Sequence, residues 1–310
     1  MNKKNYICPL CKKNNPKELG RVPDSFHFCN LEYKKPLYRT KLLNCNFCGI
    51  SYKYPLPSSK ELLKLYSKAD LSLVWGLNIN KRTDYFKVSE LILDLNPKNI
   101  LEIGCYSGTF FDFLKENGSE NEFIHNWYGV EPSKKASKYC SEKGISIISS
   151  DLSKIDKKKY KNFFELIVAI DVFEHITNLN DFIKDCKKIL KQDGILLLST
   201  GNASSIPLSF QKYWNYVCMP EHFCFLSSKT TKFICSNFGF ELRSFTKFRN
   251  ISNIPLRKYI KLYLRSILSI LINFLPSKLL SNRLRVISSI GWLPLFKKDH
   301  CVVCFVNKKL

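Results

Sequence analysis

A glycine-containing turn between two apolar segments carries the residues best suited to bind a small molecule. Residues 99–103 predict a β-strand, and Gly104-Cys105-Tyr106-Ser107-Gly108 follows directly. Glycine lets the backbone approach a ligand closely. Residues 127–130 predict a second strand at the distance that an intervening helix requires, and Glu131 ends it. A carboxylate there can accept both hydroxyls of a ribose, so the pattern indicates a ribose-bearing cofactor.

The charge beside the turn helps to distinguish between cofactors. A dinucleotide site uses G-x-G-x-x-G to seat a pyrophosphate at a helix N-terminus. Here the third glycine is missing and Glu102 precedes the turn. Because a carboxylate repels a pyrophosphate and attracts a cation, the turn favours a positively charged ligand. The alternative is a generic strand-to-helix turn without a ligand.

The E-x-G-x-x-x-G arrangement from Glu102 to Gly108 resembles motif I of class I S-adenosylmethionine-dependent methyltransferases. The cofactor of these enzymes carries an ammonium and a sulfonium group. Tyr106 stands where many relatives carry glycine, which the turn tolerates if the φ angle of Tyr106 is negative. The resemblance implies a cofactor site made of Glu102, Gly104, Gly108, Glu131, Asp151, Leu152 and Asp171.

The resemblance also implies a role for each part of this site. Asp151 and the backbone of Leu152 would receive the adenine ring. Glu102 and Gly104 would hold the methionyl end, and Asp171 would face that end from the fourth strand of the sheet.

The remaining pattern supplies the elements that must position these residues. Strands are predicted near 145–148, 163–170, 195–200, 240–248 and 300–306, and helices near 82–95, 133–143 and 178–190. This alternation is typical of a parallel sheet, in which ligands bind beyond the carboxyl ends of the strands. We therefore expect an α/β, doubly wound, Rossmann-like and mostly parallel sheet of seven strands.

Two C-x-x-C pairs near the start indicate a metal site. Cys8 and Cys11 are separated from Cys45 and Cys48 by residues 12–44, and four thiolates can close a tetrahedral structural zinc site. Reduced or redox-active dithiols are the alternative. The 13 cysteines are odd in number, and no signal peptide follows Met1, so we expect a reducing, cytoplasmic location.

These elements predict five regions along the chain. They are a zinc-ribbon-like module over 1–58, a helical linker or lid over 59–98, a methyltransferase core over 99–249, a basic helical insertion over 250–299, and the final strand over 300–310. Residues 67–80 are expected to form the lid or loop itself.

The insertion and the net charge of +23 indicate an anionic partner. Arg257, Lys261 and Arg265 recur every four residues among apolar residues. The apolar runs are shorter than the roughly 20 residues that a membrane-spanning helix needs. Such a helix suits the surface of an anionic membrane, so we expect a peripheral contact at its inner face. Packing against the same domain or against a second copy is the alternative, and the oligomeric state is left open.

Two histidines are candidates for proton transfer. Methyl transfer is an in-line displacement, and it needs a base only for a hydroxyl or a carbon acid. His175 follows the fourth strand, and the Glu221-His222 pair resembles the loop after the fifth strand in sugar C-methyltransferases, where such a pair transfers protons. The alternative is that both histidines only hold loops together.

The four-cysteine module joined to this core resembles bacterial enzymes that modify sugars and surface polysaccharides. The resemblance implies O- or C-methylation of a saccharide, free or lipid-linked, in polysaccharide biosynthesis. One alternative is a nucleic-acid methyltransferase, although the fourth strand leads into Asp171-Val172-Phe173-Glu174 rather than an Asn/Asp-Pro-Pro-aromatic element. Further alternatives are a quinone-type, lipid-like acceptor and a non-catalytic binding protein.

Overall fold

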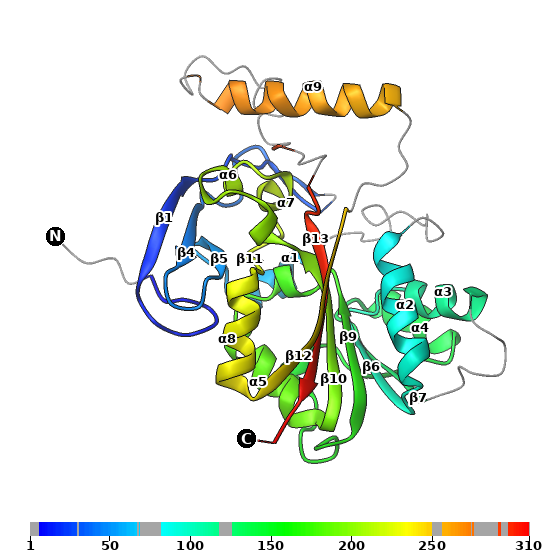
Figure 1. Ribbon diagram of the computed structural model, residues 1–310. Helices are drawn as coiled ribbons and strands as arrows, with labels where there is room; N and C mark the ends of the chain where they lie inside the picture. Colours follow the sequence, from blue (N-terminus) through cyan, green and yellow to red (C-terminus); the bar gives the residue numbers. More distant parts are fainter. Residues whose placement is uncertain are drawn as a thin grey trace.

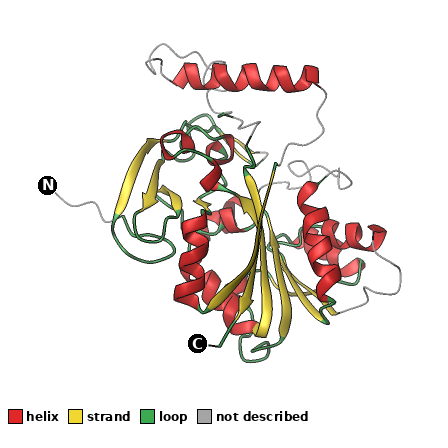
Figure 2. Ribbon diagram, in the orientation of Figure 1, coloured by secondary structure: helices red, strands yellow, loops and turns green. Residues whose placement is uncertain are grey.

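The computed structural model describes residues 6–29, 31–66, 68, 82–117, 126–249, 256–273, 275, 291–292 and 297–309. These residues form a central seven-stranded sheet with the strand order β12-β13-β10-β9-β6-β7-β8 (Figures 1 and 2). The strands are β6 (Asn99–Ile103), β7 (Asn126–Val130), β8 (Ser146–Ser149), β9 (Phe164–Ile170), β10 (Leu190–Gly201), β12 (Phe240–Phe248) and β13 (His300–Asn307).

Strand pairing confirms the doubly wound, mostly parallel fold. β6 pairs in parallel with β7 and with β9, while β7–β8 and β9–β10 are also parallel. Only β13 runs antiparallel to its neighbours β10 and β12. Strand β9 is almost entirely apolar because parallel strands are covered on both faces.

Helices cover both faces of the sheet, in two separate apolar layers. Leu166 and Val168 pack with α2 (Thr83–Leu95), α3 (Thr109–Asn117) and α4 (Lys134–Glu142). Ile167 and Ala169 pack with α5 (Leu179–Ile189) and α8 (Ser228–Phe238) on the other face. This alternation follows the two-residue period of a strand. The helix predicted near residues 133–143 is present as α4, and Ser133 caps it by accepting the N–H of Ala136 at 3.3 Å.

The N-terminal module shares a sheet with the core. Strands β1 (Pro16–Arg21), β4 (Lys41–Cys45) and β5 (Ser51–Tyr54) are extended by β11 (Cys224–Phe225), which belongs to the core segment of the chain. Strands β2 (His27–Phe28) and β3 (Leu31–Glu32) form a separate pair. The sequence does not predict the shared strand, because a two-residue strand has too little pattern to recognise.

Short elements connect the layers around the site. They are α1 (Ser59–Tyr66), α6 (Leu208–Gln211), α7 (Asn215–Cys218) and the 3-10 turns η3 (Leu152–Lys154), η4 (Phe173–His175) and η5 (Ala203–Ser205). The lid predicted over residues 67–80 lies outside the described residues, apart from Lys68.

The predicted helical insertion contains α9 (Leu256–Asn273), between β12 and β13. Figure 1 shows α9 set apart from the layers of the core. Among the residues that the structure describes, no helix is both long enough and apolar enough to cross a bilayer.

Candidate active site

A cavity of about 450 Å³ lies at the carboxyl ends of β6, β7 and β9. This is the position at which doubly wound sheets bind ligands, and the volume suits a small molecule. Six of the seven predicted cofactor residues line it: Glu102, Gly104, Glu131, Asp151, Leu152 and Asp171. Gly108 instead precedes α3, where its carbonyl accepts the N–H of Asp112 at 3.0 Å.

The turn after β6 is tightly packed against the end of β9. Gly104 has a φ angle of +71°, and a Cβ atom there would lie 2.6 Å from Cγ2 of Val172. The negative φ angle expected for Tyr106 is wrong, because its φ is +49°. Its left-handed backbone is held by the Cys140 thiol, which donates to the Tyr106 carbonyl at 2.9 Å.

Glu131 lines the cavity and also stabilises the turn after β6. Its two carboxylate oxygens accept the N–H groups of Tyr106 at 2.9 Å and Ser133 at 2.8 Å. Burial raises the pKa of Glu131 to about 7, and these two hydrogen bonds oppose the rise. Because an ionised carboxylate offers about four lone-pair sites, both oxygens can still accept a ribose hydroxyl.

Glu102 is a second buried carboxyl group in the cavity wall. Only 4% of the residue is exposed, and its Oε2 accepts the indole N–H of Trp127 at 3.0 Å. Burial raises the pKa of Glu102 to about 8, and Glu131 adds to the rise. A cationic ligand would stabilise the ionised form, so this wall is suited to an ammonium or a sulfonium.

Asp151 and Leu152 lie beyond β8, on the cavity wall. The Oδ1 atom of Asp151 accepts the N–H of Ser153 at 2.7 Å, which fixes the side chain at the start of η3. The arrangement leaves Leu152 buried beside it, as a contact for a flat ring.

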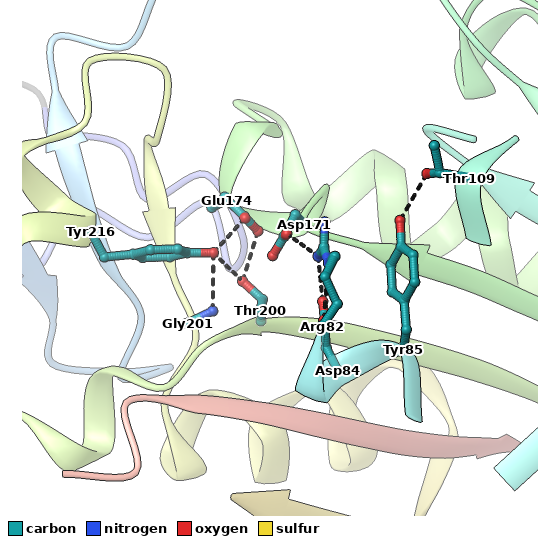
Figure 3. Close-up of polar contacts among 9 residues, drawn as sticks. All are labelled: Arg82, Asp84, Tyr85, Thr109, Asp171, Glu174, Thr200, Gly201 and Tyr216. Atoms are coloured by element: carbon teal, nitrogen blue, oxygen red, sulfur yellow. Dashed lines mark hydrogen bonds and ion pairs between the residues drawn. The ribbon is translucent and has the colours of Figure 1, made fainter. Parts of the chain in front are cut away.

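Asp171 is held in an ion pair that the sequence does not predict. Its Oδ2 lies 2.5 Å from Nη2 of Arg82, and the same guanidinium also contacts Asp84, with Nε 3.0 Å from Oδ1 (Figure 3). Arg82 directly precedes α2, so the pair joins the start of α2 to the end of β9. Tyr85 then joins α2 to α3 through a 2.9 Å hydrogen bond to Thr109.

His175 is the predicted catalytic residue that reaches the cavity. Its Nδ1 lies 2.9 Å from the carbonyl oxygen of Glu221 and 3.0 Å from the hydroxyl of Tyr66. A carbonyl only accepts, so Nδ1 carries the proton and Nε2 is the acceptor. Burial lowers the pKa of His175, and the imidazole is therefore neutral at pH 7.

Glu221 and His222 do not line this cavity. The ring of His222 is packed 4.8 Å from that of His175, and its Nδ1 lies 2.9 Å from the Tyr216 carbonyl. Burial lowers the pKa of His222 well below its usual value. The structure thus brings Glu221 and His222 against His175 without exposing either one to the cavity.

A buried polar cluster adjoins these histidines. The Glu174 carboxylate accepts the hydroxyls of Thr200, at 2.8 Å, and of Tyr216 (Figure 3). Burial raises the pKa of Glu174 to about 7. Glu174 is not among the site residues that the sequence predicts, although its position directly before His175 is a signal for it.

The four predicted metal ligands do come together. The sulfur atoms of Cys8, Cys11, Cys45 and Cys48 all lie within 4.8 Å of one another, and they come from two tight turns. Four thiolates in such a cluster fit tetrahedral zinc. His27 and Cys29 are not part of the cluster.

The first cysteine turn also contacts the wall of the cavity. Asn180 donates from its side chain to the Leu10 carbonyl at 2.7 Å and from its backbone N–H to the Pro9 carbonyl at 3.1 Å. Lys12 donates to the Asn178 side chain at 2.6 Å, and Asn178 lines the cavity. The cysteine module therefore braces the segment that leads into α5.

The fold and the cavity define a class I S-adenosylmethionine-dependent methyltransferase. The family model described as "Methyltransferase domain" matches residues 80–244, and the chain belongs to this family. Among solved structures, the YcgJ protein from Bacillus subtilis shares the fold, with a TM-score of 0.50 and 15% identity over 73% of this chain and 98% of that one.

Curated relatives match a shorter region. The ubiquinone biosynthesis O-methyltransferase of Bradyrhizobium sp. (strain ORS 278) is 29% identical over 111 residues, or 35% of this chain and 42% of that protein. The protein of the same name from Actinobacillus pleuropneumoniae serotype 5b (strain L20) is 28% identical over 126 residues, or 39% and 52%. The chain thus spans about half the length of these relatives, or less.

These relatives correct the acceptor expected from the sequence. The expectation was a saccharide in surface-polysaccharide biosynthesis, whereas the relatives are named for ubiquinone biosynthesis. The cysteine module suggested the saccharide, but none of its described residues lines the cavity, and it contacts the wall through residues such as Asn178. The module therefore says nothing about what the cavity accepts.

Proposed function

We propose that this methyltransferase methylates the hydroxyl oxygen of a phenolic, quinone-type acceptor. The observation that carries the proposal is the position of His175, whose imidazole is neutral and lines the cavity. The names of the curated relatives support the same class of acceptor.

The cofactor would be held by the carboxylates of the cavity. Glu102 suits the methionyl ammonium, Glu131 suits the ribose hydroxyls, and Asp151 with Leu152 suits the adenine. When bound, S-adenosylmethionine supplies an electrophilic methyl group on a sulfonium. The buried carboxyls fit such a cation because their ionised forms lack a cationic partner of their own within hydrogen-bond distance among the described residues.

His175 would act as the general base. In this role Nε2 receives the hydroxyl proton of the acceptor, while the Glu221 carbonyl holds the ring through Nδ1. A phenol has a pKa of about 10, whereas an aliphatic alcohol lies nearer to the roughly 15.7 of water. A histidine with a lowered pKa is a weak base, so it can assist a phenol far better than a sugar hydroxyl.

The wall beside His175 also suits an aromatic ring. Leu62 and Tyr66 of α1 line the cavity on this side, together with Ile176. Apolar and aromatic side chains stabilise a ring by contact.

We also propose that Cys8, Cys11, Cys45 and Cys48 bind one structural zinc ion. Four protein ligands leave no coordination position for a substrate. The ion would fix the turn that Asn180 contacts, and would take no part in the reaction.

The experiment is a methyl-transfer assay with labelled S-adenosylmethionine and three acceptors: an alkyl catechol, a methyl glycoside and a transfer RNA. We expect label on the catechol only, and a loss in kcat on the order of 100-fold or more in His175→Asn. Labelling of the glycoside or the RNA without the catechol would overturn the proposal.

A further inference from the structure

Helix α9 exposes a row of large apolar side chains. Leu264 and Leu271 are 61% and 59% exposed, and the row also contains Ile260, Ile267 and Leu268. These residues are spaced three or four apart, so they lie on one face of the helix.

The opposite face of α9 is buried and partly polar. Ser266 and Ser269 have no exposed surface, and the Ser269 hydroxyl accepts the N–H of Gly291 at 3.1 Å. At 100° per residue these serines lie across the helix from Leu264 and Leu271. A surface helix normally buries its apolar face. In α9 the buried face carries two serines beside Ile272, while the leucines Leu264 and Leu271 face outward.

The charged side chains around this apolar row are all positive. Arg257, Lys261 and Arg265 are exposed on α9, and residues 242–298 contain no Asp or Glu. Two copies packed through this face would bring like charges together without an acidic partner on either helix. The face is complementary to a surface that is apolar inside and negatively charged outside.

We infer that α9 is a docking surface for an anionic lipid bilayer. The helix lies in the plane of the interface, with Leu264 and Leu271 among the acyl chains and the three basic side chains at lipid phosphates. A helix of this kind need not cross the bilayer. The docking surface is formed by α9 alone, so this inference does not depend on the phenolic acceptor proposed above.

The test is flotation of the full-length protein with vesicles of phosphatidylcholine, alone or mixed with phosphatidylglycerol. We expect binding to the mixed vesicles and a loss of about tenfold or more in both Leu264→Ser/Leu271→Ser and Arg257→Gln/Lys261→Gln/Arg265→Gln. The controls are Leu93→Ser/Leu242→Ser and Lys134→Gln/Lys135→Gln/Lys184→Gln, which change exposed residues on α2, β12, α4 and α5 and should bind normally.

Three outcomes would overturn the inference. One is an absence of binding to mixed vesicles, and another is normal binding by the leucine variant. The third is a dimer in sedimentation that the leucine variant dissociates, without vesicle binding by the original protein. Circular dichroism and the melting temperature show whether each variant is folded, and methyl transfer to a soluble catechol reports separately on the proposed function.

Discussion

The Glu131 carboxylate accepts the backbone N–H of Tyr106 at 2.9 Å, which ties the end of β7 to the turn after β6. Tyr106 has a φ angle of +49°, a conformation that non-glycine residues seldom adopt. The carboxylate therefore stabilises a strained turn at the cavity, and it stands where the cofactor ribose is expected. Loop geometry and ligand binding depend on the same side chain.

Replacing Gly104 by alanine should lower the free energy of unfolding more than the same replacement at Gly144, a glycine that also has a positive φ angle. Gly104→Ala adds a Cβ 2.6 Å from Val172, whereas Gly144, with a φ of +92°, has no atom within 4 Å of such a Cβ. We expect Gly144→Ala to lower the free energy of unfolding by about 1 kcal/mol, from backbone strain alone. Gly104→Ala should lose about 1–3 kcal/mol more, from overpacking. Urea unfolding measures both, and equal losses would contradict the close packing at Gly104.

The stability of the ligand-free protein should fall as the pH rises from about 6.5 to 8. Burial raises the pKa of Glu102 to about 8 and that of Glu131 to about 7, so the folded state binds more protons than the unfolded state in this range. Two of the buried histidines, His175 and His222, have lowered pKa values and destabilise the fold only below about pH 6.5. Their effect is therefore absent from this window.

Melting temperatures across this pH range, with and without S-adenosylmethionine, give the measurement. A cationic ligand favours the ionised carboxylates, so its stabilising effect should increase over the same range. Glu102→Gln keeps the acceptor for Trp127 and should flatten both trends. A stability that rises with pH in the ligand-free protein would contradict this account.

Loss of the Asn180 side chain should weaken cofactor binding through the cysteine module. Asn180→Ala removes the 2.7 Å hydrogen bond to Leu10 and should cost about 1 kcal/mol of stability. Because Asn178 lies in the cavity wall, we also expect weaker binding of S-adenosylmethionine. Asn237→Ala is the matched control, since among the described residues the Asn237 side chain hydrogen-bonds within α8. Calorimetry measures the affinity for S-adenosylmethionine. An unchanged affinity in Asn180→Ala would show that the cysteine module does not influence cofactor binding.

Zinc should be present at one atom per chain, and Cys45→Ser should lose it. The four sulfur atoms lie within 4.8 Å of one another, and three thiolates hold the ion less tightly than four. Elemental analysis of the purified protein measures the ratio. A folded protein without metal would remove the zinc assignment and leave the cysteines as a reduced cluster.

The sequence predicts the sheet well because its evidence is local. The apolar run of β9 and the Ser133 cap of α4 are each readable within a few neighbouring residues. The carboxylates of the cavity follow from their places at strand ends, and the structure brings Glu102, Glu131 and Asp151 to one cavity.

The sequence fails where contacts join distant segments. Arg82 and Asp171 pair across 89 positions, and Tyr216 reaches Glu174 across 42. No periodicity encodes such pairs, since they depend on how the layers are packed. The exposure of the α9 leucines is equally unpredictable from the sequence. The sequence shows that α9 has an apolar face, but not whether that face packs on the core or points to solvent.

Calorimetric titration of S-adenosylmethionine into the original protein and into Glu131→Ala tests the central claim most directly. We expect one binding site per chain and a loss of affinity on the order of 100-fold in the variant, because the substitution removes both the ribose acceptor and the hydrogen bond to the Tyr106 N–H. Equal affinity in the two folded proteins, or no binding by the original, would contradict the account.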